Sequence, residues 1–117
     1  MLGFAKQLRL NQAADYRRLF RIGKKLNTQY FAIYSFANQL AHPRLGLVIA
    51  KKAARSAVKR NQIKRVIRES VRLNQVTLVG LDVMIVAYKG IDTLSKPELR
   101  EYVERGWLKV TNYCEKA

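Results

Sequence analysis

The chain has 117 residues, with 23 Lys and Arg against 8 Asp and Glu, which gives a formal net charge of +15 at pH 7. This length fits one domain, and the 49% of apolar residues can bury a core, which excludes a disordered basic tail. A single cysteine, Cys114, excludes an internal disulfide bond and a zinc site built from thiol pairs. Because so much positive charge repels itself, a folded domain of this kind usually has a polyanionic partner, most often nucleic acid.

The excess charge lies early in the chain. Residues 1–72 hold 17 of the 23 basic residues and two acids, Asp15 and Glu69, whereas residues 73–117 hold six residues of each sign. Nine of the basic residues fall within residues 51–72. The charge is therefore concentrated enough to create a directed field on one part of the protein.

The sequence shows no membrane segment. Lys6 and Arg9 interrupt the N-terminal residues before an apolar run of signal-peptide length can form. The longest stretch without charged residues, 26–43, contains six Asn, Gln, Ser and Thr residues and is too polar to span a bilayer. We expect a soluble, cytoplasmic protein.

The first predicted elements are a short helix and two strands. Asn11 is a candidate N-cap for a helix over residues 12–20, and Gly23 ends it. Residues 29–37 alternate as in a strand, and residues 44–50 form a second strand after the His42-Pro43 turn. One face of the first strand carries Tyr30, Ala32, Tyr34 and Phe36, and the other carries Phe31, Ile33 and Ser35.

A basic helix follows, capped by Ser56 and running to about Asn74. Its apolar arc contains Ile63, Val66, Ile67, Ser70, Val71 and Leu73, and the neighbouring arc contains Asn61, Lys64, Arg65, Arg68 and Arg72. Like charges at Arg60, Lys64, Arg68 and Arg72 are four residues apart, which destabilises a helix in isolation. This pattern favours a phosphate-binding face over an ordinary solvated one.

A strand and a helix complete the chain. Residues 81–88 are almost continuously apolar and indicate a buried strand, parallel to its predecessor because a helix intervenes. Ser95 and Glu98 form a capping box with Pro97 in the first turn, so a last helix begins at Lys96. The order predicts a single α+β domain over residues 1–117, with a small sheet packed against helices.

The aromatic residues allow two interpretations. Tyr16, Phe20, Tyr34 and Phe36 are either core residues or a platform on which unpaired bases stack. Core packing is the default for aromatic residues at helical or strand spacing, whereas the surrounding basic residues, Arg17, Arg18, Arg21, Lys24 and Lys25, favour the platform. A half-buried ring can serve both roles.

Protein-based catalysis is not indicated. A metal-dependent nuclease needs several converging carboxylates, and the basic region offers only Asp15 and Glu69. Three further acids, Glu98, Glu101 and Glu104, lie in the neutral part and are expected to face solvent. We therefore expect no catalytic residue, no metal site and no bound cofactor on the protein itself.

Two segments closely resemble the signature of the bacterial ribonuclease P protein subunit. They are residues 44–52, RLGLVIAKK, and residues 57–69, AVKRNQIKRVIRE. The resemblance extends to DYRRLF at residues 15–20, to Gly23 and Tyr34, and to DVMIVA at residues 82–87. It covers most of the chain.

The resemblance implies a function and a fold. Members of the family bind a large catalytic RNA that, with Mg²⁺, cleaves the 5′ leader from precursor tRNA; the protein helps to hold the leader and lowers the metal requirement. The protein is thus the accessory subunit of an endoribonuclease. The implied element order is α-β-β-β-α-β-α, with four strands and a left-handed crossover at the basic helix, a rare exception to the right-handed rule.

The resemblance also implies roles for individual residues. Contacts to the catalytic RNA and its neighbourhood are carried over to Lys52, Arg60, Asn61, Lys64, Arg65 and Arg68. The cleft for the single-stranded leader is carried over to Tyr16, Phe20 and Tyr34. Position within the charged segments adds Lys51, Arg55 and Lys59, together with Arg9, Arg17 and Arg18.

One position departs from the family pattern. The motif usually reads Arg-Asn-Arg, whereas Gln62 occupies the third position here. A neutral amide can still donate to phosphate, but the bidentate charged contact is lost. Lys59 is a candidate to compensate because it lies close by in the sequence.

Two other functions compete with this assignment. Composition alone equally fits a ribosomal-protein-like binder of structured RNA with no role in cleavage. A peripheral binder of anionic membranes would need an exposed apolar helix face, which the sheet is expected to cover. We expect no membrane partner and a monomeric free protein that does not cleave RNA by itself.

Overall fold

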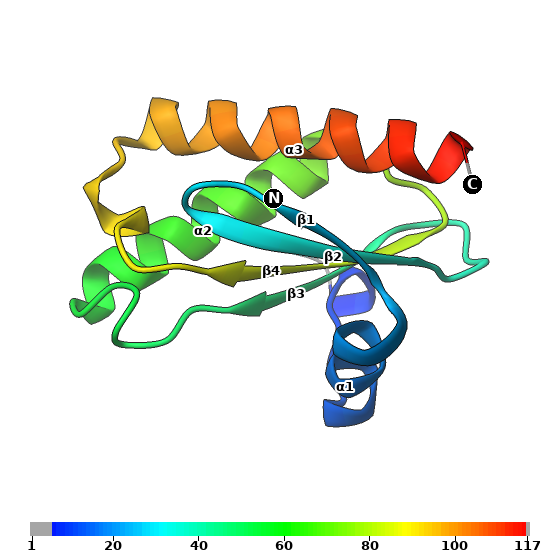
Figure 1. The fold of residues 1–117 in the computed structure, drawn as a ribbon, viewed down its shortest axis with the longest axis horizontal. Helices are drawn as coiled ribbons and strands as arrows, with labels where there is room; N and C mark the ends of the chain where they lie inside the picture. The colour runs from blue at the N-terminus through cyan, green and yellow to red at the C-terminus, as the bar shows by residue number, and fades with distance from the viewer. Residues whose placement is uncertain (1–5, 117) are drawn as a thin grey trace.

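The computed structural model describes residues 6–116, and Figure 1 shows their arrangement. The helices are α1 (Ala13–Ile22), α2 (Ala57–Leu73) and α3 (Lys96–Lys116), with short 3-10 turns η1 (Lys6–Leu8) and η2 (Ile91–Thr93). The strands are β1 (Lys24–Asn27), β2 (Phe31–Ala37), β3 (Arg44–Val48) and β4 (Leu81–Ala87). The predicted order α-β-β-β-α-β-α is confirmed.

The four strands form one mixed sheet in the order β1-β2-β4-β3. β1 pairs antiparallel with β2, and β2 pairs antiparallel with β4. β3 and β4 are parallel neighbours, and α2 connects them. The predicted parallel pair is thus confirmed, whereas the handedness of its crossover stays a prediction.

The helices cover the two faces of the sheet unequally. Figure 1 shows α2 and α3 along one face and α1 against one end of the opposite face. The larger core lies between the sheet and helices α2 and α3, and its fully buried members include Phe31, Ile33, Ile67, Val103 and Trp107. Because α1 is short, much of the opposite face is only half-covered.

Trp107 joins the two helices of the large layer through a buried hydrogen bond. Its indole Nε1–H on α3 donates to the hydroxyl of Ser70 on α2 over 2.9 Å, and the two residues are 1% and 3% exposed. This bond explains why a serine occupies the apolar arc of α2, since an unpaired indole N–H would be costly at this depth.

Close approach of α3 to the sheet depends on Gly106. A Cβ atom at this position would stand 2.6 Å from Cδ1 of Ile33, which is too close for a carbon contact. The glycine therefore lets the middle of α3 lie directly on β2.

Both predicted caps of the long helices are confirmed. The Ser56 hydroxyl accepts a hydrogen bond from the Lys59 N–H at 3.2 Å. At the start of α3, the Glu98 carboxylate accepts from the Ser95 N–H at 2.9 Å and the Ser95 hydroxyl accepts from the Glu98 N–H at 3.2 Å. The hydrogen bond from the Ser95 backbone, followed by that involving its side chain, lowers the pKa of Glu98.

Three details differ from the sequence prediction. α1 is capped by Gln12 rather than Asn11, and Gln12 makes no side-chain capping bond. β1 was expected only from the family resemblance, because three of its four residues are exposed and give no apolar pattern. Leu73, which was assigned to the apolar arc, is 66% exposed because it occupies the last position of α2, beyond the core.

The segment before α1 lies along the outer edge of β3. Arg9 forms a parallel bridge with Leu45, and the Leu10 N–H donates to the Leu45 carbonyl over 2.9 Å. Leu8 and Leu10 are buried at 3% and 4% exposure, which anchors this segment. Within residues 6–116, no helix combines the length and apolar character needed to span a membrane.

We predict that Ser70→Ala destabilises the protein by about 1–3 kcal/mol, because the buried indole N–H of Trp107 loses its acceptor. The thermal unfolding midpoint should fall by roughly 4–8 °C for each kcal/mol. Thr111→Ala is the matched control, since this hydroxyl donates only to the helix carbonyls of Trp107 and Leu108. Equal shifts for the two variants would contradict the assignment.

Candidate nucleic-acid interface

Four aromatic side chains gather where α1 meets the half-covered face of the sheet. Tyr16 and Phe20 come from α1, and Tyr34 and Phe36 come from alternate positions of β2. The rings of Phe20 and Tyr34 are 5.1 Å apart and nearly perpendicular, at 66°. We call these four residues the aromatic face.

The aromatic face is neither fully buried nor fully free. Phe20 is 48% exposed, and Tyr16, Tyr34 and Phe36 are half-buried against a small cluster of Leu10, Leu19 and Met84. The two interpretations of the sequence are therefore compatible, since each of these side chains packs partly against the protein and keeps part of its surface exposed. An accessible π-face is the feature that base stacking requires.

Cations accompany these rings. The guanidinium of Arg18 lies 5.0 Å from the ring centroid of Phe36, and the ammonium of Lys25 lies 5.6 Å from that of Tyr34. Both distances fall within the range of cation–π attraction. The aromatic face can thus offer stacking surface and positive charge together.

Gly46 allows Tyr16 to lie against β3. A Cβ atom at this position would stand 3.0 Å from two ring carbons of Tyr16 and 2.9 Å from Cδ1 of Leu10. The Tyr16 hydroxyl accepts a hydrogen bond from the Leu47 N–H at 3.3 Å, which fixes the ring over the strand. The glycine in the RLGLV segment therefore has a direct role in shaping the interface.

A basic pocket adjoins the aromatic face at Tyr16. It has a volume of about 100 Å³ and is lined by three cations, Arg9, Lys64 and Arg68, and by Tyr16, Asn11, Leu10, Leu45 and Leu47. Burial, followed by repulsion from Arg9, lowers the pKa of Arg68, although an arginine stays charged at neutral pH. Three cations without a carboxylate among the lining residues make a site for an anionic group such as phosphate.

The other polar and basic residues of the α2 motif lie outside the basic pocket. Asn61 and Arg65 are exposed on the outward side of the helix. Lys59 and Gln62 line a shallow groove at the start of α3, together with Lys96 and Ser95. Lys59 and Gln62 are therefore neighbours in space as well as in sequence, and Lys96 is a cation there that the sequence did not single out.

Arg60 and the segment before α2 form a separate group. Lys51, Lys52 and Arg55 are exposed in the turn between β3 and α2. The Arg60 side chain reaches back to this turn and donates to two of its carbonyl groups. On α1, Arg17 is exposed beside the aromatic face.

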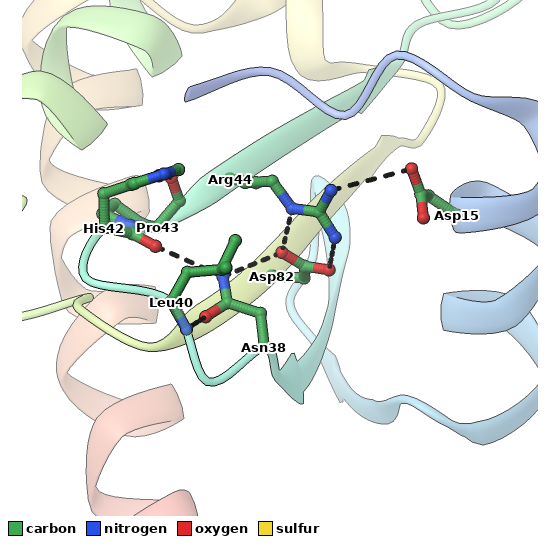
Figure 2. Close-up of polar contacts among 7 residues, drawn as sticks. All are labelled: Asp15, Asn38, Leu40, His42, Pro43, Arg44 and Asp82. Atoms are coloured by element: carbon green, nitrogen blue, oxygen red, sulfur yellow. Dashed lines mark hydrogen bonds and ion pairs between the residues drawn. The ribbon is translucent and has the colours of Figure 1, made fainter. Parts of the chain in front are cut away.

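A polar network that sequence reasoning missed underlies the interface, and Figure 2 shows it. The Arg44 guanidinium donates from Nε and Nη2 to the two carboxylate oxygens of Asp82 over 2.8 and 2.7 Å. On its other side, Nη1 lies 3.9 Å from the Asp15 carboxylate of α1, and the Asn38 amide donates to Asp82 over 2.9 Å. No sequence signal pairs these residues, because 38 positions separate Arg44 from Asp82.

The two carboxylates of the basic region, and that of Asp82, pair with arginines. Asp82 and Asp15 face Arg44, and Glu69 accepts hydrogen bonds from Arg72. In the part of the chain that the structure describes, no three His, Cys, Asp or Glu side chains converge to hold a metal ion. The donor set therefore does not fit a Mg²⁺ ion held by the protein alone.

Comparisons with known proteins agree on one family. The family model described as Ribonuclease P matches residues 4–111. The ribonuclease P protein component of Nitrosococcus oceani is 34% identical over 96% of this chain and 94% of its own length. That of Pseudomonas putida is 40% identical over 92% of this chain and 81% of its own length.

Solved structures give the same result. A structure of the Staphylococcus aureus RNase P protein has a TM-score of 0.80 at 28% identity, over 88% of this chain and 94% of the other. The RNase P protein of Thermotoga maritima has a TM-score of 0.68 at 27% identity, over 83% and 96%.

We predict that Lys64→Ala with Arg68→Ala reduces the negative slope of log K against log salt for a single-stranded oligonucleotide by about 1.4, since each phosphate contact contributes roughly 0.7. Phe20→Ala should instead weaken binding with little change in slope, because stacking releases few counterions.

A matched control removes the same charge elsewhere. Arg100→Ala with Arg105→Ala takes two exposed cations from α3, a helix that does not line the basic pocket. This pair should leave the slope almost unchanged. Equal flattening by both pairs would mean that net charge, not the basic pocket, governs binding.

Proposed function

Because this chain belongs to the ribonuclease P protein family, and is thus a component of an endoribonuclease holoenzyme in tRNA processing, we propose that it binds the 5′ leader of precursor tRNA on its aromatic face. Alongside the RNA subunit, it would hold the leader while that RNA cleaves it. The observation that carries this proposal is the contact between half-exposed rings and the basic pocket at Tyr16.

The geometry favours a single strand as the ligand. Unpaired bases can stack on Phe20, Tyr34 and Phe36, whereas bases within a duplex are already stacked on one another. Phosphates on either side of a stacked base would meet Lys25 and Arg18 at the rings and Lys64 and Arg68 in the pocket. A leader is the single-stranded part of precursor tRNA, so this ligand matches the surface.

The cleavage chemistry belongs, in this proposal, to the RNA and to Mg²⁺ ions that act with it. The protein contributes positive charge that offsets repulsion between leader and catalytic RNA, which lowers the Mg²⁺ concentration that cleavage requires. Its paired carboxylates, Asp15, Asp82 and Glu69, serve to hold arginines. The protein then has no catalytic residue of its own.

A binder of structured RNA with no role in cleavage is the alternative that an experiment must exclude. Precursor tRNA cleavage is measured at low Mg²⁺ with the cognate catalytic RNA, with and without the protein. We expect stimulation that grows with leader length over the first few nucleotides, and no cleavage by the protein without the RNA. Absence of stimulation would favour the structural RNA binder.

Tyr34→Ala tests the leader site directly. The reconstituted holoenzyme should lose about tenfold of its preference for precursor over mature tRNA, which corresponds to the loss of one stacked base. Affinity for mature tRNA should change little, since mature tRNA has no leader.

Tyr102→Ala provides a matched control. Tyr102 forms a similar edge-on pair with Tyr30, at 5.0 Å and 80°, but it belongs to α3 on the opposite face of the sheet. It should leave the preference for precursor tRNA intact. If both variants lose that preference equally, the aromatic face is not the leader site.

A further inference from the structure

The turn between β3 and α2, residues 50–56, is held rigidly although it carries three exposed cations. Ala53 and Ala54 are 4% and 1% exposed and belong to the large core. Their N–H groups both donate to the Ala50 carbonyl, over 3.0 and 3.2 Å. We call this segment the basic turn.

Arg60 completes the restraint from the first turns of α2. Its Nη1 donates to the carbonyl oxygens of Ala54 and Arg55, each over 2.8 Å. These carbonyls precede the N-cap residue Ser56 and have no place in the helical hydrogen-bond ladder. The two hydrogens of one guanidinium nitrogen are thus committed to the backbone of the basic turn.

The sequence pattern placed Arg60 with Lys64 and Arg68 as contacts to phosphate, but the three side chains differ. Lys64 and Arg68 line the basic pocket, whereas Arg60 is directed to the basic turn. A phosphate that bound Nη1 would have to displace two charge-assisted hydrogen bonds. A phosphate contact through Nη1 of Arg60 is therefore less favourable than one to Lys64 or Arg68.

We propose that Arg60 is a positioning residue: it acts on RNA by holding Lys51, Lys52 and Arg55 in a fixed arrangement that docks on folded RNA. This proposal rests on the proposed function. Cations on a rigid backbone segment bind best to phosphates that are themselves fixed in space, because the side chains then lose conformational freedom but the two backbones do not. The phosphates of a folded catalytic RNA meet this condition, whereas those of a flexible leader do not.

The location of the basic turn agrees with separate sites for the catalytic RNA and for the leader. In Figure 1 the turn lies at one end of the sheet and α1, which carries half of the aromatic face, lies at the other. A leader on the aromatic face would leave the basic turn free for a second RNA surface. The two ends would then bind two different partners, substrate and catalytic RNA.

A double-mutant cycle tests the proposal. Affinity for the catalytic RNA alone is measured for Arg60→Lys, for the triple variant Lys51→Ala, Lys52→Ala and Arg55→Ala, and for their combination. Arg60→Lys keeps the charge, but its ammonium nitrogen lies one bond closer to the backbone than Nη1 of arginine and so does not reach both carbonyls. It should weaken binding by about tenfold, the factor for one charge-assisted hydrogen bond. In the triple-variant background it should have no further effect. A tenfold effect in both backgrounds would overturn the proposal, because it would mean direct contact by Arg60.

Two further measurements separate positioning from folding and from leader binding. Hydrogen exchange at the amides of Ala53 and Ala54 should accelerate in Arg60→Lys while amides of β4 keep their protection; unchanged exchange would contradict the restraint. With saturating protein, the preference of Arg60→Lys for precursor over mature tRNA should stay as in the wild type, and its loss would assign the basic turn to the leader.

Lys64→Ala is the matched control for the double-mutant cycle. Its effect on affinity for the catalytic RNA should be the same in the wild-type and in the triple-variant background. If the wild-type protein itself fails to bind the catalytic RNA, the proposed function fails instead.

Discussion

The paired hydrogen bonds between Arg44 and Asp82 hold together the part of the structure on which the interface depends. The two residues are register partners on β3 and β4, the parallel strands that α2 connects, so the bond fixes the strands between which the basic helix begins and ends. The same guanidinium faces Asp15 on α1, which carries Tyr16 and Phe20. The hydrogen bonds to Asp82, opposed by burial, raise the pKa of Arg44. Substituting Arg44 would leave the Asp82 carboxylate, whose side chain is 11% exposed, without its cation, and substituting Asp82 would leave Arg44 only the more distant Asp15.

A consequence of this arrangement is that positive charges in the protein have different tasks. Arg44 binds a carboxylate of the protein itself, and Arg60 binds backbone carbonyl groups. Arg72 pairs with Glu69 one turn earlier on α2. Other cations, such as Lys64 and Arg68, line a surface where an external anion can bind. The net charge of +15 therefore overstates the number of phosphates that the protein can contact. Only the structure distinguishes the cations that bind groups of the protein from those that face an open surface.

Much of the fold was predictable because its strongest elements have strong periodicity. The caps and apolar arc identified α2, the continuous apolar run identified β4, and the Ser95–Glu98 capping box located the start of α3. β1 escaped prediction because an exposed edge strand of four residues has almost no pattern to detect. The aromatic side chains could not be assigned to core or surface, since half-buried rings satisfy both patterns. The roles of Asp82 and Arg60 could not be predicted from the sequence. Asp82 contacts a side chain 38 residues away, and Arg60 contacts backbone carbonyl groups, and neither kind of contact produces a residue pattern.

The segment before α1 has a consequence for the behaviour of the free protein. By pairing with Leu45 it covers the outer edge of β3, which leaves β1, at the other side of the sheet, as the exposed edge among the described strands. Unpaired strand edges invite other chains to add strands, and short edges rich in lysine resist this. β1 is four residues long and begins with Lys24 and Lys25, so its length and charge both discourage pairing with a strand of another chain. The edge that the sheet leaves uncovered is thus the one whose shortness and charge oppose the addition of a further strand.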